Sequence, residues 1–250
     1  MRLDRFVSEV TGATRSEAKA MISGGRVTVN SGVVKDCGLA VKEETDCICI
    51  DGKQQEFSEF AYFMLNKPAG VVSATRDRAD AVVVSLISAE DRKKRALFPV
   101  GRLDKDTEGL LIITDDGPLS HRLLSPKKHT DKLYFAKLKR EISKEDITLF
   151  AQGFRVDEEL TAMPAVLRHL SESERKTFLA EGEAGAAVTL AEGKFHEVKR
   201  MFAATGNEVL YLKRMAMGKV FLDPALAPGE YRKLTVQEIA ALQEGGTGEV

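Results

Sequence analysis

"GRLDKDTEGLLIITDDG", residues 101–117, places five carboxylates around a short apolar run. The four consecutive apolar residues at 110–113 predict a buried strand, and the polar segments on either side predict turns. Three explanations of the carboxylates compete. They could form a calcium-binding loop, they could belong to an acidic surface turn, or one of them could be a catalytic group held by a rigid turn.

The calcium explanation depends on spacing. Positions 1, 3, 5, 6, 8 and 12 of an EF-hand loop would be occupied by Asp104, Asp106, Glu108, Gly109, Leu111 and Asp115. An EF-hand loop lies between two helices, but the preceding "LFPVGR" contains proline and glycine, and the following "DDGPL" predicts a turn. Aspartate at position 12 is also short for a bidentate ligand. We therefore do not expect a calcium site.

The surface-turn explanation treats 104–109 as a loop and Asp116-Gly117 as a hairpin turn beside the apolar strand. It accounts for the acids at the end of the stretch. It does not account for Arg102 and Asp104, which are two residues apart on an extended chain and so point the same way at the mouth of the strand. The catalytic explanation therefore stays open.

The charge of the chain is balanced overall but unevenly distributed. The 250 residues carry a net charge of −1, yet residues 122–140 hold seven Lys or Arg against one acid, and residues 194–219 hold six against two. These stretches could meet on one face and bind phosphate, or they could be solvated faces of strands and helices.

Several classes of protein are not expected. The sequence has no apolar run long enough to span a membrane and no signal-peptide core, so we expect a cytoplasmic protein. Its three cysteines form no CxxC motif and its four histidines are scattered, so we expect neither a disulfide framework nor a metal site.

Residues 1–53 predict a small separate module. Leu3, Phe6, Val7 and Val10 recur at helical spacing before Gly12, and Thr14 and Glu17 have the spacing of a capping box that opens a second helix. "RVTVNSGVV" and "DCICIDG" predict short strands. The pattern resembles the S4 RNA-binding domain. That resemblance implies contacts with the RNA backbone from Arg5, Arg15, Lys19 and Arg26.

The remainder predicts one larger α+β domain. After a polar linker at 54–60, strand-like segments dominate and helices come singly between them, which favours a mainly antiparallel sheet over residues 61–240. Residues 241–250, which end in "GGTGEV", predict a disordered tail.

Four motifs in order resemble the RsuA family of pseudouridine synthases, whose members also carry an S4 module. They are "YFMLNKPAGVVSAT", "GRLDKDTEGLLIITDDG", "SPKKHTDKLY" and "EGKFHEVKRMFAATGNEV". The resemblance implies isomerisation of a uridine in ribosomal RNA, most closely small-subunit (16S) RNA. Because related enzymes that act on large-subunit RNA share the "GRLDxDTxGL" core, that substrate stays an alternative.

The resemblance also implies the roles of single residues. Asp104 would be the nucleophilic carboxylate, Lys199 its buried cationic partner in a position often held by Arg, and Tyr134 the ring that stacks on the flipped uracil. Asp106 would be a turn or cap residue. Leu212 would line the base pocket, His196 would touch RNA, and RNA backbone contacts would come from Lys67, Arg102, Lys132 and Arg200.

This chemistry needs no cofactor, because the isomerisation has no redox step. We expect a monomer that binds ribosomal RNA. The alternative from another class is a non-catalytic RNA-binding or ribosome-assembly protein, and the presence of Asp104, Tyr134 and Lys199 counts against it.

Overall fold

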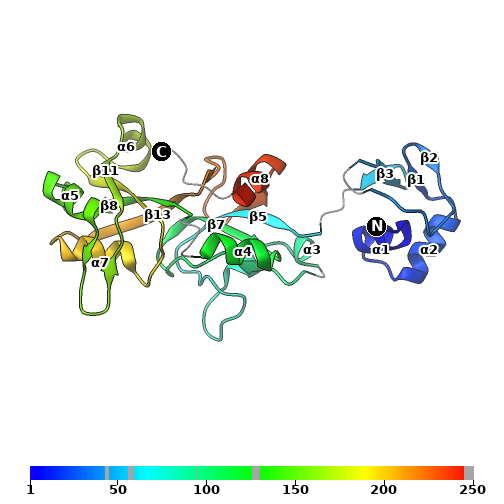
Figure 1. Ribbon diagram of the computed structural model, residues 1–250, viewed down its shortest axis with the longest axis horizontal. Coiled ribbons are helices and arrows are strands. Elements are labelled where there is room, and N and C mark those ends of the chain that lie inside the picture. Colours follow the sequence, from blue (N-terminus) through cyan, green and yellow to red (C-terminus); the bar gives the residue numbers. More distant parts are fainter. Residues whose placement is uncertain (43–44, 56–58, 94, 126–129, 245–250) are drawn as a thin grey trace. The chain divides into compact units, whose positions relative to one another are not determined.

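The chain forms two compact units, Met1–Glu59 and Phe60–Val250 (Figure 1). The computed structural model describes all residues except 43–44, 56–58, 94, 126–129 and 245–250. Strand β4, Lys53–Gln55, pairs with β3, Ile48–Ile50, and so belongs to the first unit. The predicted boundary at residue 53 is therefore wrong, because residues 54 and 55 of the predicted linker 54–60 belong to a strand of the first unit. Residues 56–58 of that linker lie outside the described residues.

The first unit contains the predicted helix pair and a small sheet. Its helices are α1, Leu3–Thr11, and α2, Arg15–Ser23, and its other strands are β1, Val27–Val29, and β2, Gly32–Val33. Gly12 ends α1 in the left-handed conformation, and Thr14 and Glu17 form the predicted capping box. Asn30 and Ser31 turn the chain with positive φ between β1 and β2. The sequence-based prediction of these elements is confirmed.

The second unit is built on a long, mainly antiparallel sheet in the order β11-β12-β8-β13-β7-β5-β15. Its strands are β5 (Tyr62–Lys67), β7 (Glu108–Thr114), β8 (Lys132–Leu138), β11 (Val166–His169), β12 (Ala184–Leu190), β13 (Val209–Met217) and β15 (Tyr231–Lys233). Short strands β6 (Phe98–Pro99) and β14 (Val220–Phe221) pair with β7 and β13, and β9 (Phe154–Arg155) pairs with β10 (Thr161–Ala162). The predicted α+β class is confirmed.

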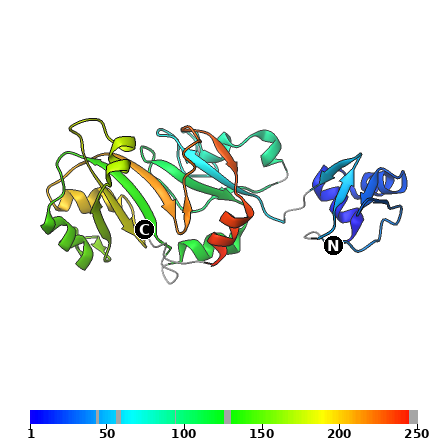
Figure 2. The ribbon, with the colours of Figure 1, turned by 90° about the horizontal axis from the view of Figure 1, so that it is seen from above.

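Helices cover both faces of this sheet (Figures 1 and 2). They are η1 (Val83–Leu86), α3 (Ala89–Arg92), α4 (Gly117–Leu124), α5 (Lys144–Gln152), α6 (Glu172–Phe178), α7 (Glu197–Ala204) and α8 (Val236–Glu244). Successive residues of a strand point to opposite faces. Leu111 of β7 therefore joins the core that contains Phe202 of α7, and Ile112 joins the core that contains Leu119 of α4 and Leu242 of α8. No helix in the described ranges is long and apolar enough to cross a membrane.

A parallel contact between β7 and β13 joins the two halves of the sheet, and it requires glycine. Gly109 pairs with Arg214, has a φ of 101°, and would collide with the carbonyl oxygen of Arg214 if it carried a Cβ. A glycine here lets the two backbones approach closely. The contact holds the turn that precedes β7 beside the middle of the sheet, where β13 pairs with β8.

These elements correct two sequence-based interpretations, and they also bear on the EF-hand loop that the sequence argues against. Strand β7 begins at Glu108, inside the 12-residue span that an EF-hand loop would need, which excludes that loop. Asp116 is not in a hairpin turn; its side chain accepts a hydrogen bond from the Leu119 amide and caps α4. Helix α8 reaches Glu244, so the first part of the predicted tail is helical, and residues 245–250 lie outside the described residues.

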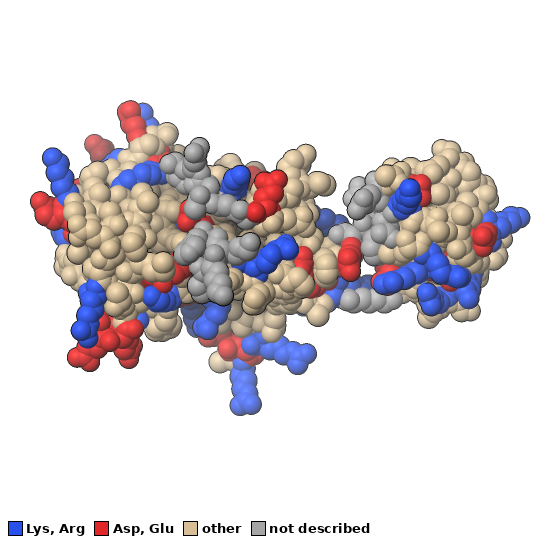
Figure 3. Space-filling view, in the orientation of Figure 1, with Lys and Arg blue, Asp and Glu red and all other residues tan. Residues whose placement is uncertain are grey.

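The two basic stretches meet, because β8 pairs with β13, but they do not form one basic face. Lys132 and Arg214 are buried. Lys137 pairs with Glu183 at 2.8 Å, and Lys139 pairs with Glu208 at 3.1 Å. Figure 3 shows both signs of charge interspersed over the visible face of the larger unit. Phosphate binding by a uniform patch of cations along these strands is therefore not supported.

Candidate active site

The segment before β7 is held rigidly by buried hydrogen bonds. The Ser73 hydroxyl accepts a hydrogen bond from the Leu103 amide at 3.0 Å and donates one to the Leu103 carbonyl at 2.8 Å. The Thr107 amide donates to the carbonyl of Asp104 at 3.1 Å and closes a tight turn. The backbone at Asp104 is thereby fixed in the turn just before β7, as a preorganised catalytic group requires.

Lys67 supports this turn from inside the protein. Its buried ammonium donates to the carbonyls of Thr107 at 2.9 Å, Pro68 at 3.0 Å and Lys105 at 3.3 Å. Burial lowers the pKa of Lys67 to about 8, and the nearby acids, Glu108 first, oppose that shift. The prediction that Lys67 contacts RNA is wrong, because its charge is used to bind backbone carbonyls.

Asp104 and Lys199 lie together, as the family resemblance implied. The Lys199 Nζ is 3.4 Å from Asp104 Oδ2, and it also hydrogen-bonds Asp106 Oδ1 at 2.6 Å. This bond holds the pKa of the Asp106 carboxyl below its usual value. The side chains of Asp104 and Lys199 are each 25% exposed, so the pair is not buried as predicted but faces an open pocket.

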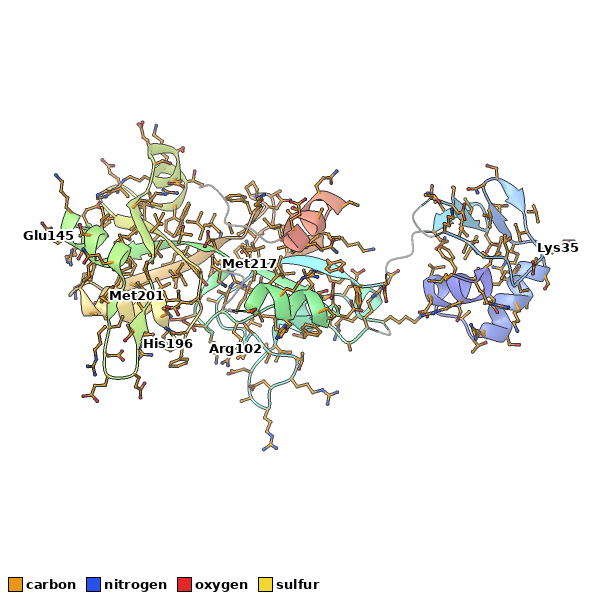
Figure 4. All side chains as sticks on the ribbon, in the orientation of Figure 1. Lys35, Arg102, Glu145, His196, Met201 and Met217 are labelled. Atoms are coloured by element: carbon orange, nitrogen blue, oxygen red, sulfur yellow. The ribbon has the colours of Figure 1, made fainter. Side chains whose placement is uncertain are left out.

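His196 completes the group of charged side chains around Asp104. Its Nε2 lies 3.6 Å from Asp104 Oδ1, and it precedes α7 with a left-handed φ of 49°. Figure 4 shows His196 and Arg102 on the same side of the larger unit, and both residues line the pocket. Arg102 is exposed, which is compatible with its predicted contact with RNA.

Tyr134 and Leu212 form the apolar wall of the same pocket. Tyr134 lies on β8 and is 7% exposed, and Leu212 lies on the neighbouring strand β13 and is also buried. An aromatic ring and an aliphatic side chain opposite a carboxylate suit a flat, mostly apolar ligand with one reactive polar centre. The strand pairing therefore gathers Asp104, Tyr134, Lys199 and Leu212, which are far apart in the sequence, around one pocket.

Two further predicted RNA contacts are not supported. Lys132 is buried and donates to the carbonyls of Thr130 at 2.8 Å and Ala191 at 3.2 Å, and burial lowers its pKa to about 8. Arg200 donates from Nε to Asp157 at 2.8 Å and forms a two-point ion pair with it. The prediction for Lys132 is wrong, and Arg200 would have to leave Asp157 before it could contact a phosphate.

In the smaller unit, Arg5, Arg15 and Lys19 are exposed on α1 and α2. Figure 3 shows several Lys and Arg side chains along the lower part of this unit and others at its top and right edge. Arg26 is already paired with Asp51, with Nε 2.8 Å from Oδ1. Arg5 also lies 3.7 Å from Glu9, so Arg15 and Lys19 remain the better candidates for RNA contact.

Comparison with known proteins agrees with this geometry. The family model described as RNA pseudouridylate synthase matches residues 61–204, and the S4 domain model matches residues 1–47. The chain belongs to the RNA pseudouridylate synthase family. It is an enzyme of the RsuA type that carries an S4 domain and converts uridine in RNA to pseudouridine.

Full-length relatives support this assignment. The chain is 45% identical over 244 residues to the uncharacterized RNA pseudouridine synthase YtzG of Bacillus subtilis, covering 98% of this chain and 99% of the relative. It is 39% identical over 246 residues to the ribosomal small subunit pseudouridine synthase A of Escherichia coli, covering 97% and 100%. A solved structure described as a pseudouridylate synthase aligns with a TM-score of 0.64 at 37% identity, covering 97% of this chain and 99% of that one.

Two pocket residues of this synthase were not predicted from the sequence. Thr107 has a buried hydroxyl with no hydrogen-bond partner among the described residues. Glu197 is 4% exposed, and its Oε1 also has no partner among them. A hydrophobic stripe of Val198, Met201 and Phe202 identifies the buried face of α7, but nothing in that pattern indicates that the preceding glutamate is also buried.

Glu197 meets a second carboxyl group inside the protein. Its Oε2 accepts a hydrogen bond from the Lys194 amide at 2.9 Å, and the Glu192 carboxylate is near enough to raise the pKa of Glu197. Glu192 already accepts from the Met163 amide at 2.8 Å and pairs with the Lys194 ammonium at 2.7 Å. Two neighbouring carboxylates repel each other, which favours the neutral form of the more deeply buried one. Burial and the Glu192 carboxylate raise the pKa of Glu197 to about 7, which makes Glu197 the protonated partner.

We expect Glu197→Gln to change how the stability of this synthase depends on pH. An unfolded glutamate loses its proton near pH 4.5, whereas folded Glu197 keeps it until about pH 7. The folded state binds more protons between these values, so its free energy of unfolding falls there by up to about 1.4 kcal/mol per pH unit and the loss levels off above pH 7. Glutamine mimics the protonated form and should remove this slope.

Urea unfolding at pH 5, 6, 7 and 8 measures the effect. The exposed Glu172→Gln is the matched control and should keep the wild-type slope. The other charges that act on Glu197 are those of Lys194, Lys132 and Arg200, and they are unchanged in both variants. Equal slopes for wild type and Glu197→Gln would contradict the raised pKa of Glu197.

Proposed function

We propose that this enzyme isomerises a specific uridine of small-subunit (16S) ribosomal RNA to pseudouridine, with Asp104 as the nucleophilic carboxylate. Relatives that bear the name ribosomal small subunit pseudouridine synthase A, at 38% to 40% identity over nearly the whole chain, support the substrate. The observation that carries the catalytic proposal is the position of Asp104, fixed by a rigid turn at a pocket lined by Tyr134 and Leu212, with the Lys199 ammonium 3.4 Å away.

The reaction replaces the bond from C1′ to N1 by a bond from C1′ to C5, and the uracil keeps the same number of protons. The bond from C1′ to uracil N1 breaks, the uracil turns in the pocket, and C1′ bonds to C5. N1 gains a proton and C5 loses one, so no oxidant or cofactor is needed. A carboxylate beside C1′ suits this step, because C1′ becomes electron-poor as the base leaves. Asp104 can attack C1′ or promote elimination to a glycal.

The other pocket residues have distinct roles in this proposal. Lys199 places a positive charge 3.4 Å from the Asp104 carboxylate, next to the substrate. Tyr134 stacks on the flipped uracil and compensates part of the cost of unstacking, roughly 1 to 3 kcal/mol. Leu212 packs against the base, and Arg102 and His196 contact the RNA beside it.

Chemical mapping of pseudouridine in ribosomal RNA, from cells with and without the gene, tests the proposal. We expect one site in small-subunit RNA to lose its pseudouridine when the gene is absent. Loss of a site in large-subunit RNA would assign the other substrate. An unchanged map, together with a defect in ribosome assembly, would instead favour a non-catalytic role.

The S4 unit should contribute to RNA binding and not to chemistry. Arg15 and Lys19 lie four residues apart on the exposed face of α2, so replacing both with alanine should remove two phosphate contacts. We expect KM to rise roughly tenfold, kcat to stay within about twofold, and the salt slope of binding to fall by about one for each cation removed.

The matched control for this change is Lys176→Ala, which removes an exposed lysine from α6 of the other unit and should change neither parameter. A fall in kcat at constant KM would make the S4 unit part of the active site. The cytoplasmic location and the monomeric state also remain proposals.

A further inference from the structure

Phe195 is a large aromatic side chain exposed at the entrance of the active site. It is 69% exposed, and its chain neighbours Lys194 and His196 both line the pocket. Exposing a phenylalanine to water costs free energy, so its exposure between two pocket residues needs an explanation. Phe221 is similarly exposed, at 51%, but it lies on β14 and neither of its chain neighbours lines the pocket.

One face of Phe195 is already covered by an aromatic ring. Its ring is stacked on the imidazole of His196, with the centroids 3.8 Å apart and an angle of 19° between the planes. His196 is in turn 3.6 Å from Asp104. Because one face of the phenyl ring is occupied, a single flat group can stack on the other face. The ring can therefore extend a stack of bases by one partner, but it cannot insert between two bases.

The backbone holds this aromatic pair in place. The Phe195 carbonyl accepts a hydrogen bond from Arg200 at 3.4 Å, and the Lys194 amide donates to the buried Glu197 at 2.9 Å. His196 adopts a left-handed φ of 49°, which is unfavourable for a residue with a Cβ and is seen at functional sites when the surrounding structure enforces it. The backbone that carries the ring is thus held in place, and stacking on His196 restricts the ring itself, which lowers the entropy cost of ordering it on binding.

We propose that Phe195 is a stacking platform for the base next to the target uridine, so that base, Phe195 and His196 form a continuous stack beside Asp104. The inference rests on the proposed function. When the uridine leaves its stack to reach Asp104, the neighbouring base loses its partner. The free face of Phe195 replaces that partner, and Arg102 at the same pocket is available for the intervening phosphate.

The test uses equilibrium binding of an RNA fragment that spans the uridine found by pseudouridine mapping. All proteins carry Asp104→Asn, so that no turnover occurs during the measurement. Replacing Phe195 with alanine should weaken binding about tenfold, as the loss of one stacked base predicts. Phe195→Leu, which keeps an apolar side chain without an aromatic face, should weaken it similarly, and Phe195→Trp should retain it. Phe221→Ala is the matched control and should bind like the parent.

Abasic nucleotides identify the stacked base. If the missing base is the one that stacks on Phe195, the Phe195→Ala and parent proteins should bind the abasic RNA equally well. If the base on the other side of the uridine is missing, Phe195→Ala should still bind about tenfold more weakly than the parent. The proposal would be overturned if the Phe195→Ala and parent proteins bound intact RNA equally well, a result that would point to a protein partner for this ring. It would also be overturned if the tenfold difference persisted with both abasic RNAs. Wild-type turnover of the same fragment, measured separately, tests the proposed function itself.

Discussion

Replacing Asp104 with asparagine should abolish pseudouridine formation, with a loss of roughly ten-thousandfold or more, as expected when a nucleophile is removed. The asparagine side chain has the same shape but lacks the negative charge and the attacking oxygen. The turn should keep its structure, because Ser73, Lys67 and the Thr107 amide hold it through backbone groups. Single-turnover assays on ribosomal RNA measure the rate, and RNA binding should stay within a few-fold of wild type.

Asp106→Asn is the informative comparison, because Asp106 is the other carboxylate bound to Lys199. Its side chain is 74% exposed in the turn, which does not suit a group that must act on a base inside the pocket. We expect this variant to remain active. Loss of activity in Asp106→Asn with retention in Asp104→Asn, after deamidation has been excluded by mass spectrometry, would transfer the catalytic role to Asp106.

The elements with strong local patterns could be predicted from the sequence. The apolar run in "GRLDKDTEGLLIITDDG" became the central strand β7, and the capping box of Thr14 and Glu17 opened α2. The short elements could not be predicted in this way. Two-residue strands such as β9 and β10 show too little of the alternating pattern, and their pairing depends on distant parts of the chain.

The roles of single lysines were the least predictable feature of the site. A lysine on a strand is usually solvated, but Lys67 and Lys132 are buried and bind three and two backbone carbonyls respectively. Both stabilise segments that line the pocket, the 104–107 turn and the segment that starts at Ala191. Local sequence does not show which loop carbonyls will lie beneath a strand, since the loops come from elsewhere in the chain.

The position of Lys199 between two carboxylates also appears only in three dimensions. The family motif pairs Lys199 with Asp104, but the shorter contact is with Asp106, at 2.6 Å against 3.4 Å. Because an ammonium is a point charge with three donors, it can serve both acids. In the free enzyme, Asp106 therefore competes for the cation that the proposed chemistry needs at Asp104.

Lys199→Ala should leave two neighbouring carboxylates without their cation and slow turnover about thirtyfold or more. Removing one partner of a buried pair costs about 3 to 5 kcal/mol, and we expect roughly 2 kcal/mol here because both side chains are 25% exposed. Lys199→Arg keeps the charge and should retain most of the activity. Single-turnover rates measure these effects.

The double variant Asp104→Asn with Lys199→Ala distinguishes a catalytic pair from two independent contributions. If Lys199 acts through its contact with the Asp104 carboxylate, its removal can cost nothing more once that carboxylate is gone, so the double variant should form pseudouridine no more slowly than Asp104→Asn alone. Any residual rate therefore has to be measured over long incubations with excess enzyme. A further tenfold loss in the double variant would show that the ammonium contacts the substrate directly, for example a phosphate or the departing uracil, and that its proximity to Asp104 is not its main function.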